Sequence, residues 1–277
     1  MADASDLKPY REALNIPVSE GNRVFYYIGG TDTFKAMRAA IEEATRENAS
    51  AFYVYLLGWH LEIDTPMSGK EGSATFENVI RDASDRGVQI RAMLWNNPLA
   101  PNTSAVAFLR GLKNGAAIQD DSAPSEPVGC HHQKIMLVRG KNGLVAFCGG
   151  LDISKDRVME VRRPRGAPLH DIHCEIRGPA VNKLLKLFVD RWQANVQRPQ
   201  IEYDKGPLRV TAVESGDSAT PSTPAKGEQM VAIATTMNQF VQRISDDIAG
   251  STDEYCALSR TVATSISGLI GAAKRFI

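Results

Sequence analysis

The residues best suited to chemistry lie near the middle of the chain, at His132 and Lys134. The apolar run from Ile135 to Val138 follows them and predicts a buried strand. Because side chains alternate between the two faces of a strand, His132 and Lys134 are expected to point the same way at its edge. The imidazole could attack phosphorus or move a proton, and the ammonium could hold charged oxygens. This pair therefore indicates chemistry on a phosphate ester.

Length and charge narrow the class of protein. The chain has 277 residues, which allows one large domain or two small ones, and 43% of them are hydrophobic, enough for a sizeable core. Lys plus Arg and Asp plus Glu both number 32, so the net charge is zero, whereas a nucleic-acid-binding protein usually has a basic excess. The four cysteines show no paired spacing and are interpreted as reduced thiols of an intracellular protein.

The termini and the apolar runs bear on localisation. Residues 1–6 are polar and acidic, which is not the pattern of a signal peptide. The most apolar run, residues 51–58, is too short to cross a bilayer. We therefore expect a cytoplasmic or peripheral membrane protein without a transmembrane segment, in which any lipid contact is made at a surface.

Strand and helix patterns alternate along the first half of the chain. Apolar runs predict strands at 23–28, 51–57 and 88–95, and helical spacing predicts helices at 31–47, 76–87 and 103–112. Residues 116–129 are expected to form a loop, and the later elements are strands at 170–176 and 229–235 and helices from Gly178-Pro179 and at 261–276. This alternation predicts an α/β fold with a mixed, largely parallel sheet flanked by helices on both faces.

Together these residues resemble the phospholipase D superfamily over roughly residues 20–277. The family signature is His-x-Lys, four residues, an Asp, and then a glycine pair followed by a polar residue. Here it appears as His132-Gln133-Lys134 with Gly149-Gly150-Leu151-Asp152 downstream. Gly58-Trp59 after a hydrophobic strand, and His170-Asp171-Ile172-His173 before Arg177-Gly178-Pro179, also match the family's pattern.

The resemblance implies a phosphodiesterase built from two similar halves, with one His-x-Lys from each half at their interface. One histidine attacks phosphorus and becomes phosphorylated, and the other protonates the leaving alcohol and then activates water or an acceptor alcohol. The lysines hold the phosphate oxygens, and neither a metal nor another cofactor is expected. The implied domains are a polar lead-in at 1–22, a catalytic half at 23–198, a flexible linker at 199–228, and at 229–277 the start of a second, truncated half.

Two departures from the family pattern stand out. The motif's Asp is replaced by Arg139, a cation that could displace the histidine strand or lower the imidazole pKa. The chain also holds no second His-x-Lys. The second catalytic half would then come from a missing C-terminal region or from a homodimer partner.

The remaining candidate residues each have a structural alternative. Gly150 and Asp152 are expected to line the phosphate pocket, or else to form a tight turn. Trp59 is expected to border the substrate, or else to belong to the core. The residues His170, Asp171 and His173 are expected to support the catalytic strands, or else to satisfy buried polar groups. A zinc site among the His and Cys residues is disfavoured, because neither neighbouring histidine pair has a chelating spacing on a strand. The basic run from Arg162 to Arg165 could attract lipid headgroups or nucleic acid, or be a solvated loop.

Three functional hypotheses follow. The first is a phospholipase D-like phosphodiesterase that hydrolyses or transphosphatidylates a phospholipid headgroup through a phosphohistidine; a variant of it acts on nucleic acid. The second is a non-catalytic fragment or degenerate half-domain. The third is an enzyme completed by homodimerisation, in which two copies of His132 and Lys134 form one site.

Overall fold

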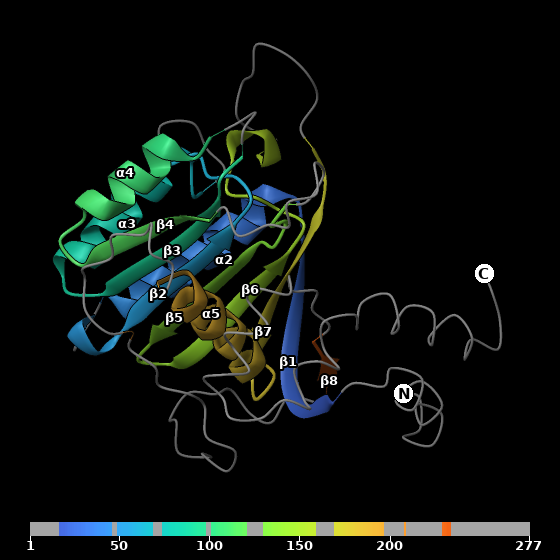
Figure 1. Ribbon diagram of the computed structural model, residues 1–277. Helices are drawn as coiled ribbons and strands as arrows, with labels where there is room; N and C mark the ends of the chain where they lie inside the picture. The colour runs from blue at the N-terminus through green and yellow to red at the C-terminus, as the bar shows by residue number, and fades with distance from the viewer. Residues whose placement is uncertain are drawn as a thin grey trace, which may run out of the picture.

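A computed structural model gives the fold of the chain (Figure 1). It describes residues 17–45, 49–68, 74–97, 101–120, 130–158, 169–196, 208 and 229–233. The expected linker at 199–228, apart from Leu208, and the expected helix at 261–276 lie outside these residues. The division of the chain into two halves stays a prediction.

Eight strands form one sheet, in the order β4-β3-β2-β5-β6-β7-β1-β8. Their bounds are β1 Val18–Ile28, β2 Tyr53–Gly58, β3 Gln89–Trp95, β4 Gly115–Asp120, β5 Ile135–Gly140, β6 Gly143–Gly149, β7 Ile172–Arg177 and β8 Gln229–Ala232. The helices are α2 Gly30–Ala44, α3 Phe76–Asp85, α4 Thr103–Gly111 and α5 Val181–Val196. Short 3-10 turns lie at Ala49–Ala51 and Lys155–Arg157.

The sheet is mixed, as expected. Strands β2, β3 and β4 pair in parallel, while β5 pairs antiparallel with β2, and every later neighbour pair along the sheet is antiparallel. Five strands, β1 to β4 and β6, therefore run in one direction. The parallel pairing itself is confined to β2, β3 and β4, because β5, β6 and β7, which follow one another along the chain, pair antiparallel.

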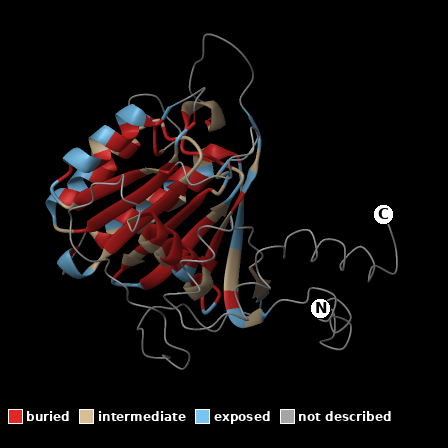
Figure 2. Ribbon diagram, in the orientation of Figure 1, coloured by how far each residue is buried: buried red, intermediate tan, exposed pale blue. Residues whose placement is uncertain are grey.

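Helices cover both faces of the sheet, as expected (Figures 1 and 2). Alternate residues of β2 separate the two cores: Val54 and Leu56 pack with α2, α3 and α4, whereas Tyr55 and Leu57 pack with α5. The side chains that α5 buries include all five predicted from its spacing, Val181, Leu184, Leu185, Phe188 and Trp192. Because successive side chains of a strand point to opposite faces, the sheet has one hydrophobic core on each face.

Two sequence-based boundaries were wrong. Residues 115–120 form β4 rather than the start of a loop, because Ala116, Ala117 and Ile118 pair with β3 and are buried on both faces. Strand β1 begins at Val18, inside the expected polar lead-in, and extends along both β7 and β8. Because β4 ends at Asp120, the segment that leads to His132 begins there.

Candidate functional site

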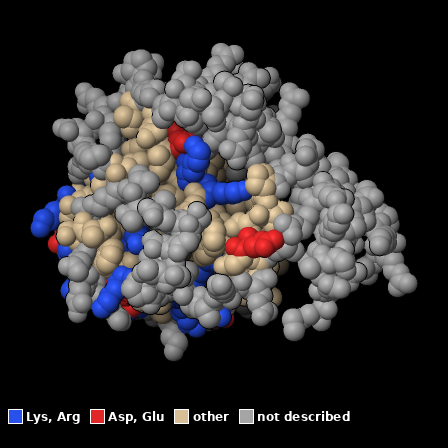
Figure 3. All heavy atoms as spheres, turned by 90° about the horizontal axis from the view of Figure 1, so that it is seen from below, with Lys and Arg blue, Asp and Glu red and all other residues tan. Residues whose placement is uncertain are grey.

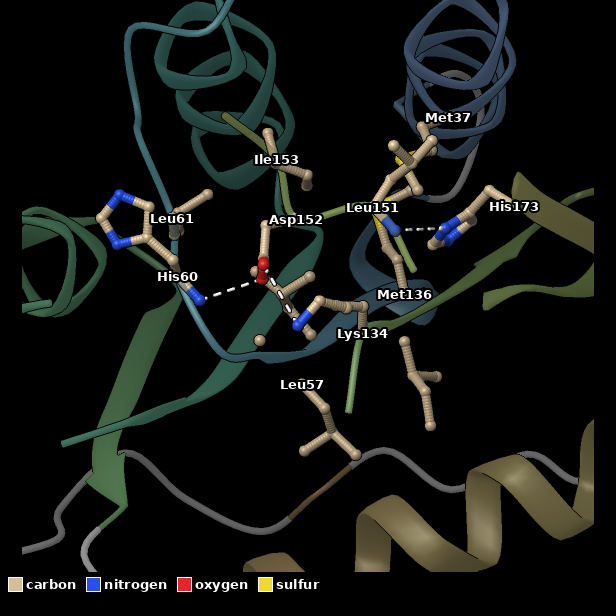
Figure 4. Close-up of a pocket in the computed structure, with 13 residues that line it drawn as sticks. Met37, Leu57, His60, Leu61, Lys134, Met136, Leu151, Asp152, Ile153 and His173 are labelled. Carbon is tan, nitrogen blue, oxygen red and sulfur yellow. Dashed lines mark hydrogen bonds and ion pairs between the residues drawn. The ribbon is translucent and has the colours of Figure 1, made fainter. Parts of the chain in front are cut away.

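The site lies at one end of the sheet, where residues 130–134 lead into β5 without regular secondary structure. The ammonium of Lys134 lies 3.1 Å from Asp152 Oδ2, and the two side chains are 4% and 2% exposed. Asp152 Oδ1 also accepts a hydrogen bond of 3.0 Å from the backbone N–H of His60 (Figure 4). Asp152 therefore connects the segment after β2 with the lysine before β5.

Trp59 contacts both residues of the expected catalytic pair. Its ring centroid lies 5.5 Å from that of His132 and 5.3 Å from Lys134 Nζ, within the range of a cation–π contact. Trp59 also stacks on Trp95 at the end of β3, with 6.0 Å between the ring centroids. The indole thus forms a wall against which the catalytic pair rests, and a role in binding substrate stays a prediction.

Asn102 fixes this wall, although the pattern around it predicted only a turn. Its buried amide donates to the carbonyls of Trp59 and Trp95, at 2.9 Å each, and its oxygen accepts from the backbone N–H of Leu61 at 3.0 Å. Because a buried amide is costly unless its hydrogen bonds are made, this residue fixes the ends of β2 and β3 relative to each other.

The glycine pair after β6 has a steric reason. A Cβ on Gly149 would lie 2.8 Å from His173 Nδ1, and one on Gly150 would collide with the carboxylate of Asp171. The backbone N–H of Gly150 donates to Ile172 O at 3.0 Å. The glycines therefore allow β6 to approach β7 closely and turn towards Asp152, which fits the tight-turn interpretation; whether Gly150 also lines a phosphate is untested.

The three residues expected to support the site lie in different surroundings. His173 is buried, and its Nδ1 accepts from Leu151 N at 3.4 Å (Figure 4). The backbone carbonyl of Asp171 accepts from Gly29 N at 2.8 Å, which joins this turn to the start of α2. His170 is exposed ahead of β7.

Burial controls the protonation of the site. It lowers the pKa of His132 from 6.5, and the positive charge of Lys134 lowers it further. Burial also lowers the pKa of Lys134 from 10.5, while Asp152 opposes that shift. At neutral pH His132 is accordingly a neutral imidazole beside a cation, the state required for attack on phosphorus.

A cavity of about 280 Å³ opens beside the catalytic pair. Its lining includes His132, Lys134 and Gly149 and the apolar side chains of Ile135, Leu184 and Leu187. Polar and apolar side chains therefore line the same cavity.

In the described part of the chain no group of three His, Cys, Asp or Glu side chains could hold a metal ion, so the zinc alternative has no ligand set there.

The structure separates Arg139 from the site. Arg139 lies near the far end of β5, opposite Tyr53 and Leu144, about 16 Å along the strand from Lys134 at roughly 3.3 Å per residue. Burial, Lys134 and Arg157 are what lower the pKa of His132. The expectation that Arg139 lowers the pKa of the His132 imidazole was therefore wrong, and its effect on the position of the histidine strand stays a prediction.

Comparison with known proteins gives relatives that are named phospholipase D or cardiolipin synthase. Phospholipase D zeta 1 of Arabidopsis thaliana is 23% identical over 223 residues, covering 62% of this chain and 19% of its own length. Cardiolipin synthase 1 of Staphylococcus aureus (strain MRSA252) is 23% identical over 218 residues, covering 74% of this chain and 40% of its own length. These relatives confirm the resemblance to the phospholipase D superfamily, and the chain spans about a fifth to two fifths of their length. No family model matches the sequence.

Solved structures give weaker likenesses. Polyphosphate kinase from Porphyromonas gingivalis has a TM-score of 0.38 and 10% identity, covering 61% of this chain and 22% of its own. Yeast tyrosyl-DNA phosphodiesterase has a TM-score of 0.33 and 11% identity, covering 62% of this chain and 38% of its own.

Removing Asp152 should destabilise the fold strongly. Asp152→Asn leaves Lys134 buried without its counter-charge, which typically costs roughly 3–5 kcal/mol. The matched control is Asp64→Asn, because Asp64 pairs with Lys155 at 2.7 Å on the surface, where such a pair contributes about 0–1 kcal/mol. Urea unfolding measures both; equal losses would contradict a structural role for the buried pair.

His173 should make the fold sensitive to acid. Burial lowers the pKa of His173 to about 4, below the ordinary value of 6.5. The unfolded state therefore binds more protons between these values, so stability is full above pH 6.5 and is lost as the pH falls towards 4, by about 3 kcal/mol. His173→Gln should flatten this dependence in urea unfolding at pH 4.5 and 7, whereas exposed His170→Gln should preserve it.

Proposed function

We propose that this chain forms one catalytic half of a phospholipase D-like phosphodiesterase, which hydrolyses a phospholipid headgroup or transfers the phosphatidyl group to an alcohol. The observation that carries the proposal is the arrangement of His132 and Lys134: a partly exposed neutral imidazole lies beside a buried ammonium held on Asp152. Relatives named phospholipase D and cardiolipin synthase support the reaction class.

The proposed reaction has two displacements at phosphorus. In the first, a ring nitrogen of His132 attacks, an N–P bond forms, and the P–O bond to the leaving alcohol breaks as that oxygen gains a proton. In the second, water or an acceptor alcohol loses a proton and attacks, and the N–P bond breaks. Lys134 stabilises the charge on the phosphoryl oxygens in both steps.

The acid and base of these steps need a second group. His132-Gln133-Lys134 is the one His-x-Lys in the sequence. We propose that the second histidine comes from another copy of this chain or from a further segment of a longer protein. General acid–base help of this kind contributes about 10²–10⁴-fold in rate, so a half-site on its own should be slow.

Lipid fits the site better than nucleic acid. Ile135, Leu184 and Leu187 line the cavity beside His132, which suits the apolar part of a phospholipid. The net charge of the chain is zero, and the described residues of the face in Figure 3 include both basic (blue) and acidic (red) side chains, with blue the more frequent. A nucleic-acid substrate would instead require a basic surface and give salt-sensitive binding.

Peripheral contact with a membrane is the second part of the proposal. Tyr26, Ile28 and Ile172 are 71%, 75% and 55% exposed, and they lie on the α5 face of the sheet at the same end as His132. No helix in the described part of the chain is long and apolar enough to cross a bilayer. Contact would therefore be made by this exposed apolar surface.

The catalytic proposal is tested with bis(p-nitrophenyl) phosphate and with phosphatidylcholine vesicles. His132→Ala should lower turnover at least about 10²-fold, because no other group replaces the nucleophile, while Arg86→Ala, an exposed residue at the end of α3, should change it little. Activity per mole that falls on dilution would assign the second histidine to another copy. Folded wild-type protein without turnover at any concentration would contradict the proposal for this chain and favour the non-catalytic half.

Membrane contact is tested by sedimentation with phosphatidylcholine vesicles. The double variant Ile28→Ser, Ile172→Ser removes exposed apolar surface and should weaken binding at least about tenfold, since each buried CH₂ contributes about 0.8 kcal/mol. Phe25→Ser is the control, because Phe25 is 40% exposed on the opposite face of β1. Equal binding by all three proteins would exclude this surface.

A further inference from the structure

The segment that carries His132 and Lys134 makes different side-chain contacts on its two sides. Residues 131–134 precede β5 and have no strand ladder of their own. His132 contacts Trp59 and Lys134 contacts Asp152 on one side. His131 and Gln133 make their side-chain contacts on the other side, as the alternation of an extended segment predicts, and Gln133 also borders the cavity that His132 and Lys134 line.

On that second side lies a buried pair, the Asp120–Arg191 anchor. Arg191 of α5 donates from Nη2 to Asp120 Oδ2 at the end of β4, at 2.5 Å, and the two side chains are 3% and 1% exposed. Arg191 Nη1 donates to Gln133 Oε1, and His131 Nε2 lies 3.7 Å from Asp120 Oδ2. Gln133 and His131 therefore both contact this buried ion pair.

The sequence contained a signal for this anchor. Arg191 follows Phe188 by three residues and Leu184 by seven, so it falls within the buried stripe of α5. A guanidinium there requires a partner, because an unpaired buried charge is costly. Asp120 was hidden because its strand was interpreted as a loop.

We propose that Gln133, held by Arg191, is a positioning residue that sets the place of the His132 imidazole; the proposal rests on the proposed function for its catalytic consequence. A short segment outside a strand gains its geometry from side-chain contacts, and a hydrogen bond from a buried guanidinium is among the stronger ones. Fixing Gln133 on one side and Lys134 on the other confines the residue between them. His132 can then present its ring against Trp59 while remaining partly exposed to substrate.

The informative substitution is at Gln133 rather than in the ion pair. Replacing Arg191 would leave Asp120 as an uncompensated buried charge and destabilise the whole fold. Gln133→Met keeps the length of the side chain and removes the acceptor, while Gln133→Glu keeps an acceptor oxygen for Arg191. Gln119→Met is the matched control, because Gln119 lies next to Asp120 but bonds with Asn96 at 2.7 Å.

The first readout is independent of catalysis. Proton signals of the His132 ring, assigned with His132→Ala, carry a ring-current shift from Trp59 because the two rings are 5.5 Å apart. In Gln133→Met these signals should move most of the way to the values of free histidine, while Gln133→Glu and Gln119→Met keep the wild-type values. Unchanged signals in Gln133→Met, or equal movement in Gln133→Glu, would overturn the proposal.

The second readout is turnover of bis(p-nitrophenyl) phosphate. Gln133→Met should lower kcat on the order of 10- to 10²-fold with little change in KM, because a misplaced nucleophile costs rate more than binding. Gln133→Glu should restore kcat; a fall in Gln133→Met that Gln133→Glu does not restore would overturn the proposal. If the wild type shows no turnover but the ring signals behave as described, the positioning role stands and the proposed function fails.

Discussion

The buried contact between Lys134 and Asp152 is the interaction on which the rest of the site depends. Two charges that are 4% and 2% exposed must satisfy each other, since water cannot reach them. Asp152 can reach Lys134 only because Gly149 and Gly150 let β6 turn closely past β7. The same carboxylate accepts a hydrogen bond from the backbone N–H of His60. Asp152, which follows β6, therefore connects the segment after β2 with the segment before β5.

This arrangement also explains how the imidazole stays reactive. A carboxylate placed directly on a histidine would raise its pKa and keep it protonated. Here the carboxylate of Asp152 is paired with Lys134, and although its charge raises the pKa of His132, the two larger effects, burial and the positive charge of Lys134, lower it. The ammonium is thereby held on Asp152 close to the imidazole, and its positive charge favours the neutral form of the ring.

Sequence reasoning succeeded where pattern and burial coincide. The apolar run at 135–138 and the helical spacing of α5 follow from local periodicity, and the structure agrees. His132 and Lys134 precede the strand, and both contact Trp59. The distance of Arg139 from the site follows from simple strand length, yet its place in the motif suggested proximity. The place of Arg191 in the buried stripe of α5 signals a buried partner, but the identity of that partner could not be assigned, because Asp120 lies far along the chain; the same holds for Asn102, which bonds with Trp59. The expected substrate-binding roles of Trp59, Gly150 and Asp152 stay predictions. So does the expected supporting role of His170, Asp171 and His173.

The pairing of β1 with β7 has a consequence for synthesis of the protein. Ile28 pairs with Ile172, so the first described strand waits for a partner that is made 144 residues later. At about 5–20 residues per second, the ribosome needs roughly 7–30 s to cover that interval. During this time β1 presents unpaired backbone groups, and the outer edge of β6 (Gly143–Gly149) does so over the last part of the interval, before β7 begins at Ile172; such edges are templates for association with other chains. The order in which the strands leave the ribosome therefore makes the nascent chain most dependent on chaperones just before β7 is complete.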